Sequence, residues 1–165
     1  MKDNALKQWK ETSSELIKLL NSVSQEKFNK IPFEGSWTAG QLGDHLLKSY
    51  GAVEVLNGST EKTDRPADEK VAEVKSLFLD FSIKMDSPEE ILPSEKPLNK
   101  ESIINGLQEK IEAFNLVIEN KDLTETCTDY AIPEYGPFTR LEWIHFSIAH
   151  TQRHVHQLRK IISNL

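Results

Sequence analysis

Two histidines near the end of the chain, His150 and His154, have the spacing of metal ligands on a helix. At about 100° per residue they lie about 40° apart around a helix, with Cβ atoms about 5 to 6 Å apart, which suits one cation. The neighbouring His145 and His156 lie about 120° to 140° from His150 around the same helix and roughly 16 Å from each other. We therefore expect these two to lie outside the site and to form no pair of their own.

His45 is the only histidine elsewhere in the chain and can supply a third ligand, because it lies beside two leucines on the inward face of a predicted helix. Three imidazoles with a fourth position left to water are typical of a catalytic zinc site. Two alternatives stay open: His150 and His154 bind no metal, and His45 is a core histidine bonded to a carbonyl. A zinc protease is excluded, since Thr151 stands where an HExxH helix needs glutamate.

Four amphipathic segments are long enough to position these histidines. The second and fourth segments begin with capping boxes, in which Thr38 and Thr139 are each followed three residues later by glutamine or glutamate. Gly51 weakens the second segment by about 1 kcal/mol relative to alanine, and Asn57 with Gly58 ends it. Apolar residues at helical spacing predict helices over residues 5–23, 38–57, 100–120 and 139–163.

The connection between the second and third helices, residues 59–100, is long and rich in proline. It can hold a short helix around residues 68–81, whereas residues 86–97 are predicted to lie extended on the surface. No alternating run is long enough to build a sheet. The predicted fold is therefore all-α: one domain over residues 1–165, a four-helix bundle whose long helix 2 to helix 3 connection permits a crossover.

The composition excludes several classes of protein. The chain has 165 residues, with 20 Lys and Arg against 26 Asp and Glu, and its formal net charge of −6 comes without a clustered basic face. We therefore expect no nucleic-acid partner. The single Cys127 excludes an internal disulfide and fits a reducing compartment. Because there is no apolar leader and no run of eighteen apolar residues, we expect no membrane association and a cytoplasmic location.

Two stretches together resemble a known family: SWTAGQLGDHL at residues 36–46 and HTQRHVHQL at residues 150–158. They are similar to the DinB-like, or YfiT-like, superfamily of metalloenzymes, in which a Trp-Thr pair opens the second helix. A histidine shortly after that pair and a late HxxxH are the family's metal ligands. His45, His150 and His154 match these positions, and the resemblance covers nearly the whole chain.

The resemblance implies an up-down-down-up bundle with one divalent metal ion. It also implies relatives that transfer low-molecular-weight thiols or isomerise substrates with a thiol cofactor, and its motif marks no general acid or base. Because imidazole suits zinc, nickel, copper and iron, the residues do not name the metal. We expect zinc or nickel first and iron next, with a low-molecular-weight thiol as a further cofactor.

Two other polar side chains, Gln157 and Arg153, are candidates near the metal, whereas Asp44 and Cys127 are not. Gln157 can hydrogen-bond a ligand or a bound water, or else cap the end of the bundle. Arg153 can reach an anionic substrate, or else pair with glutamates at the surface. Asp44 lies about 100° from His45 around the helix and is expected to face solvent. Cys127 has no partner nearby in the sequence, and we assign it no catalytic role.

Aromatic residues in the loop before the fourth helix are candidates for the rim of a pocket. Tyr130, Tyr135 and Phe138 fill this role because loops over a rigid bundle carry specificity. Trp37 and Trp143, in contrast, are predicted to be core or staple residues.

Two classes of function remain. The first is a metal-dependent enzyme that transfers a thiol or a metal-activated water to a small electrophilic molecule. The alternative is a non-catalytic metal-binding or stress-response interaction module. An open coordination position favours the enzyme, whereas a fourth protein ligand favours the module. The sequence leaves the oligomeric state open, with a homodimer as one option.

Overall fold

The helices of the chain begin and end close to the boundaries that the periodicity predicts. The computed structural model describes all 165 residues, and more than half of them are helical, so the all-α class is confirmed. No helix combines the length and the apolar character needed to cross a membrane. The elements, in chain order, are α1 (Lys2–Asn21), α2 (Gln25–Phe28), α3 (Ala39–Ser49), α4 (Ala52–Asn57), β1 (Thr60–Glu61), α5 (Val71–Phe78), η1 (Glu89–Ile91), α6 (Lys100–Asn120), β2 (Thr126–Cys127) and α7 (Arg140–Ile162).

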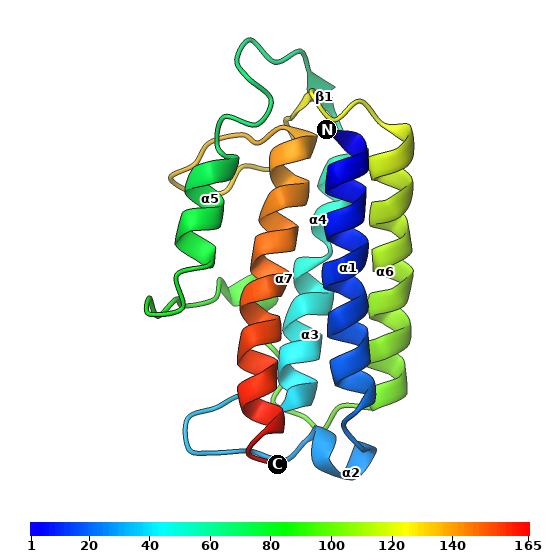
Figure 1. Cartoon of the computed structure of the whole chain (residues 1–165), viewed down its shortest axis with the longest axis vertical. Coiled ribbons are helices and arrows are strands. Elements are labelled where there is room, and N and C mark those ends of the chain that lie inside the picture. Colours follow the sequence, from blue (N-terminus) through cyan, green and yellow to red (C-terminus); the bar gives the residue numbers. More distant parts are fainter.

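The helices α1, α3, α6 and α7 lie side by side, and α4 continues the line of α3 (Figure 1). α1 and α3 each pack against both α6 and α7, and α5 packs against the outer side of α7. In Figure 1, α1 and α7 run from the upper to the lower end of the view, whereas α3 and α6 run the other way. The two helices that carry the candidate ligands, α3 and α7, are therefore neighbours.

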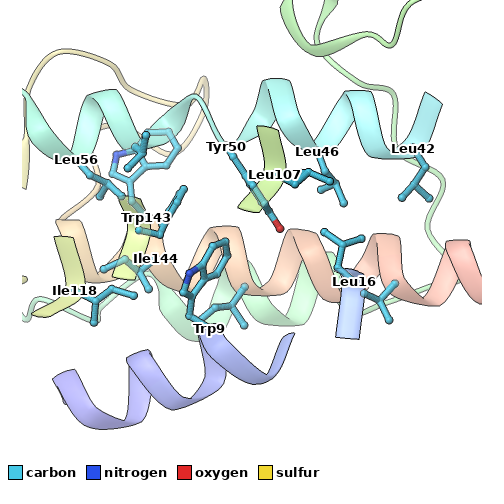
Figure 2. Close-up of a cluster of buried hydrophobic side chains, with 14 of the residues drawn as sticks. Trp9, Leu16, Leu42, Leu46, Tyr50, Leu56, Leu107, Ile118, Trp143 and Ile144 are labelled. Atoms are coloured by element: carbon cyan, nitrogen blue, oxygen red, sulfur yellow. The ribbon is translucent and has the colours of Figure 1, made fainter. Parts of the chain in front are cut away.

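A large apolar core joins these helices, and Figure 2 shows part of it. Trp9 of α1 is fully buried in it, with its ring 4.5 Å from Phe114 and 5.2 Å from Tyr50. The polar atoms of these rings are satisfied, because the Trp9 Nε1 donates to the Ile111 carbonyl and the Tyr50 hydroxyl bonds the Thr151 hydroxyl at 2.7 Å. The core thus holds α3 and α7 at a fixed spacing.

Both predicted capping boxes are present. The Thr38 hydroxyl accepts from the backbone N–H of Gln41 at 3.0 Å, and the Thr139 hydroxyl accepts from that of Glu142 at 3.1 Å. Each box satisfies backbone donors that the first helical turn leaves free. The starts of α3 and α7, and so the positions of their histidines along each helix, are set by local sequence.

The structure corrects two predictions about the backbone. The predicted helix 38–57 is divided into α3 and α4, with Gly51 at the break; a Cβ on Gly51 would lie 2.9 Å from the Lys48 carbonyl oxygen, so this turn needs a glycine. A small antiparallel sheet is also present, in which Thr60 pairs with Cys127 and Glu61 with Thr126. Strands of two residues are too short to produce an alternating pattern.

One buried carboxylate ties the crossover to the start of α7. Glu142 is only 1 % exposed, and its carboxylate accepts from the Arg65 guanidinium at 2.6 and 2.8 Å. It also accepts from the backbone N–H groups of Lys70 and Thr139. Burial alone would raise the pKa of Glu142, but these donors lower it below its usual value, so the carboxylate stays charged.

Replacing this carboxylate should destabilise the fold. We expect Glu142→Gln to lower the free energy of unfolding by about 3 kcal/mol, because an amide with one acceptor oxygen replaces a buried carboxylate that accepts four hydrogen bonds, two of them from the Arg65 charge. Urea unfolding measures the change. The matched control is Glu54→Gln, which breaks an exposed ion pair with Lys110 and should cost less than about 0.5 kcal/mol. Equal losses in the two variants would contradict this account of Glu142.

Candidate metal centre

Three buried histidines converge between α3 and α7. His45 is 1 % exposed, His150 6 % and His154 7 %. The Nε2 of His150 lies 3.1 Å from the Nε2 of His45 and 3.0 Å from that of His154, and ligand atoms of all three lie within 4.8 Å of one another. The structure thus brings together the three residues that the sequence singles out.

The outward nitrogen of each ring has a partner of its own. The Nδ1 of His45 donates to the Ile91 carbonyl at 2.8 Å, and the Nδ1 of His154 donates to the Gln157 Oε1 at 2.8 Å. The Nδ1 of His150 lies 3.1 Å from the Ser49 hydroxyl. Metal-binding histidines usually carry such a bond on the nitrogen that faces away from the metal, because it fixes the tautomer and the ring orientation.

These partners leave the inward nitrogens with more lone pairs than protons. A neutral imidazole has one N–H, and a carbonyl oxygen only accepts, so the Nε2 atoms of His45 and His154 present lone pairs. His150 can offer at most one proton to both of them. Two ligands about 2.0 to 2.1 Å from one tetrahedral ion are about 3.3 Å apart, close to the separations found here. The three Nε2 atoms therefore cannot all hydrogen-bond to one another, whereas all three can coordinate one divalent ion.

Burial also keeps the three rings neutral. Desolvation, with the charge effect of the neighbouring histidines adding to it, lowers the pKa of His154 to about 3 and that of His150 well below its usual value. The pKa of His45 is lowered by burial too, although the Ile91 carbonyl and Asp44 oppose this shift. A histidine must be neutral to bind a metal, so at neutral pH the rings are already in the binding form.

The second half of the crossover packs against α3 beside this site, which corrects the prediction for Asp44. Asp44 does not face solvent: it is 8 % exposed, accepts from the Ser94 backbone N–H at 2.8 Å and pairs with Lys48 at 3.0 Å. Lys48 also donates to the Leu92 carbonyl. Residues 86–97 lie at the surface as predicted, interrupted by η1, and residues 91–94 are anchored there because the polar face of α3 offers them charged partners.

A cavity of about 1110 Å³ adjoins the histidines, with walls from residues 33–37, α3, α4, residues 78–92, residues 130–133 and α7. Trp37 lines it, with its ring 4.9 Å from His45 and 6.1 Å from His154. Trp143 is buried, as predicted, and also lines the cavity. Trp37 packs against the apolar core, in line with its predicted role as a core or staple residue, and it also lines the cavity because the loop before α3 folds back over the histidines.

Arg153 lines the same cavity but is already engaged. Its guanidinium donates to the carbonyls of Phe78 and Asp80 at 3.2 and 3.0 Å, and also to that of Ile83. It pairs with no glutamate, so the surface-pair alternative is wrong. Arg153 holds the segment after α5 against α7 and so helps to build the cavity wall.

The other predicted pocket residues divide into two groups. Gln157 lines the cavity and orients His154, so it does not merely cap the bundle. Tyr130 lines the cavity and is 51 % exposed. Tyr135 does not reach the cavity and packs on Phe138, which is fully buried in the core. The loop turns the rings of Tyr135 and Phe138 toward the protein interior, where they pack over the start of α7.

The remaining histidines lie outside the triad, as their helix angles predict. His145 is buried but faces Lys75 and Asp68, and His156 stacks on Phe81 at a ring distance of 4.0 Å. Cys127 is a buried thiol whose pKa burial raises to about 11, which fits the absence of an assigned role.

Sequence reasoning missed Ser49 as a partner of His150, although its place four residues after His45 puts it on the same helix face as His45.

Comparison with known proteins gives one match. A family model described as the DinB superfamily matches residues 8–158, a span that includes all three converging histidines. Searches of the curated proteins and of the solved structures find no match.

The buried His145 should make the fold sensitive to acid. Burial, with Lys75 adding to it, lowers the pKa of His145 from 6.5 to about 4. Between these values the unfolded chain takes up a proton that the folded chain does not, so the free energy of unfolding falls as the pH falls through this window. Between pH 7 and pH 4.5, the free energy of unfolding should fall by about 1 to 2 kcal/mol less in His145→Leu than in the unchanged protein.

Urea unfolding at the two pH values tests this expectation. The matched control is His156→Leu, because that ring lies exposed on the same helix. An unchanged acid response in His145→Leu would overturn the assignment.

Proposed function

The chain belongs to the DinB superfamily, and on this premise we propose that it is a metal-dependent enzyme. The Nε2 atoms of His45, His150 and His154 would hold one divalent ion, with zinc or nickel as the first expectation and iron as the next. The observation that carries the proposal is the surplus of lone pairs: three Nε2 atoms face one another, and at most one proton is available to them.

The reaction we propose is transfer of a low-molecular-weight thiol, or of water, to a small electrophilic molecule. When bound, a divalent ion lowers the pKa of a thiol or water and so supplies a nucleophile near neutral pH. The residues of the chain provide the setting. The Ile91 carbonyl and Gln157 hold two imidazole rings in one tautomer, and the half-buried Trp37 shields the His45 and His154 rings from water on one side.

The cavity favours an enzyme over a protein with a closed, non-catalytic metal site and over an interaction module. The group of converging side chains contains three histidine ligands and no carboxylate, thiolate or further imidazole. Around the triad lies a cavity of about 1110 Å³, which is large enough for a small-molecule substrate together with a thiol. A coordination position that is open toward a cavity is typical of catalytic rather than structural sites.

The proposal includes the family's topology, an up-down-down-up four-helix bundle with a long helix 2 to helix 3 crossover. Its support is the chain direction in Figure 1, where α1 and α7 run opposite to α3 and α6. The segment between α4 and α6 returns the chain from the upper to the lower end of that view.

Metal content tests the ligand set. We expect about one divalent ion per chain in protein purified without an affinity tag, measured by elemental analysis, and loss of that ion in His150→Ala. Acid should release the metal, because protons compete for the imidazole nitrogens. His145→Ala and His156→Ala are the matched controls from the same helix. Retention in His150→Ala with loss in either control would show that the site lies on another face of α7.

Transfer activity tests the reaction. The metal-loaded protein is incubated with a panel of low-molecular-weight thiols and a generic electrophile, and thioether formation is followed by mass spectrometry. We expect His45→Ala to lower the rate at least about tenfold, since loss of one ligand removes the activated nucleophile. Equal rates for the two proteins across the panel, and with water as the nucleophile, would contradict the proposed function.

A further inference from the structure

Arg153 is the one arginine of the chain that forms no ion pair. The other three each pair with a glutamate, and they are Arg65, Arg140 and Arg159. Arg153 donates only to carbonyl oxygens, which are neutral and leave its positive charge without a counterion. The carboxylate of Asp80 bonds Ser82 rather than Arg153. In a chain with 26 acidic residues, this half-buried charge stays unpaired.

Part of the Arg153 guanidinium is free to bind a ligand. A guanidinium has five N–H groups, and the three bonds to carbonyls use two on Nη1 and one on Nη2. The Nε–H and the second Nη2–H therefore have no protein partner. The buried polar atoms that lack a partner do not include the Arg153 Nε, so this donor is accessible. Nε and Nη2 form one planar edge, which matches the two oxygens of a carboxylate.

Arg153 lies beside the triad, between His150 and His154 in the sequence, and it lines the cavity. Lys160 follows it by seven residues, so the two lie on one face of α7 about 10 Å apart along the helix axis. Lys160 also lines the cavity and forms no ion pair; its Nζ lies 4.9 Å from the centre of the Phe33 ring. The cavity therefore has two unpaired cations on the C-terminal side of His150.

The complete set of charged side chains around the cavity has an excess of positive charge. It consists of four cations and two carboxylates: Lys48, Lys84, Arg153 and Lys160 with Asp86 and Glu90. Lys48 pairs with Asp44, whereas neither Asp86 nor Glu90 forms an ion pair with any of these cations. The chain as a whole has the opposite sign, with a net charge of −6. This local excess favours an anion in the cavity over an uncharged molecule.

We propose that the planar edge of Arg153 binds a carboxylate group of one of the two reacting small molecules, with Lys160 as a second cation that attracts it. The ligand is thus a carboxylate-bearing thiol or a carboxylate-bearing electrophile, and both present the same group to Arg153. The inference rests on the proposed function for what the bound molecule does at the triad. Binding of the carboxylate itself does not depend on the metal.

Two pairs of probes, each a carboxylate and its amide, test the proposal. N-acetylcysteine and N-acetylcysteinamide represent the thiol, whereas 4-methylbenzoate and 4-methylbenzamide represent an electrophile without its reactive group. Affinities for the full chain are measured by NMR titration. In at least one pair, we expect the carboxylate to bind about five- to tenfold more tightly than the amide, because hydrogen bonds between charged groups are the stronger ones. That pair identifies which molecule carries the carboxylate. Equal affinities within both pairs would overturn the proposal.

The same substitution at two arginines of α7 tests the residue. Arg153→Gln should reduce the carboxylate preference to within about twofold. The matched control is Arg159→Gln, which removes an arginine outside the cavity and should leave the preference unchanged. Arg153→Gln also loses bonds that anchor the crossover, so equal weakening of both members of a pair would show that Arg153 is only an anchor and would overturn the proposal.

A second variant keeps the anchor intact. The Lys160 side chain holds no part of the crossover by a hydrogen bond, and Lys160→Met should weaken the carboxylate about two- to threefold while leaving the amide unchanged. Should Arg153→Gln fail to fold, an unchanged preference in Lys160→Met would overturn the proposal.

A carboxylate can also bind a metal ion directly, so both pairs are measured again in His45→Ala. This variant should lose the metal and the transfer activity yet keep the carboxylate preference. Loss of the preference in His45→Ala, with its retention in Arg153→Gln, would assign the preference to the metal and overturn the proposal. Failure of the transfer assay with the expected binding results would refute the proposed function alone.

Discussion

The structure of the site depends on one constraint: three imidazole rings must turn a lone pair toward the same buried point. Such an arrangement is unfavourable by itself, since the lone pairs repel and burial removes the water that would otherwise bond them. It persists because the opposite nitrogens of His45, His150 and His154 are held by a backbone carbonyl, a hydroxyl and an amide. A divalent ion at that point would relieve the repulsion, so binding energy and ring orientation support each other.

The elements that hold the rings come from different parts of the chain. The apolar core sets the spacing of α3 and α7, and the two capping boxes set where each helix starts. The crossover then supplies the Ile91 carbonyl to His45, and Arg153 secures the same crossover to α7. Because these contacts span segments far apart in sequence, the site forms only when the whole fold is in place.

Local patterns in the sequence predict the helices and the three converging histidines well. The capping boxes and the spacing of His150 and His154 depend on residues within one or two helical turns, and such interactions can be read from the sequence. The features that the sequence misplaces or does not foresee depend on distant partners. Asp44 is buried because Ser94 and the backbone around it fold onto α3, and Trp37 lines the cavity because its loop folds over the histidines. No periodicity within either segment records those contacts.

The crossover is anchored beside the triad mainly through its backbone. The hydrogen bonds from α3 and α7 that hold it near the triad all use backbone atoms of the crossover: the carbonyls of Phe78, Asp80, Ile83, Ile91 and Leu92, and the N–H of Ser94. Backbone groups are the same for nearly all residue types. Side chains of residues 78–92 that line the cavity can therefore change without loss of these anchors. The shape and charge of the cavity can vary in this way while the bond that orients His45 stays in place.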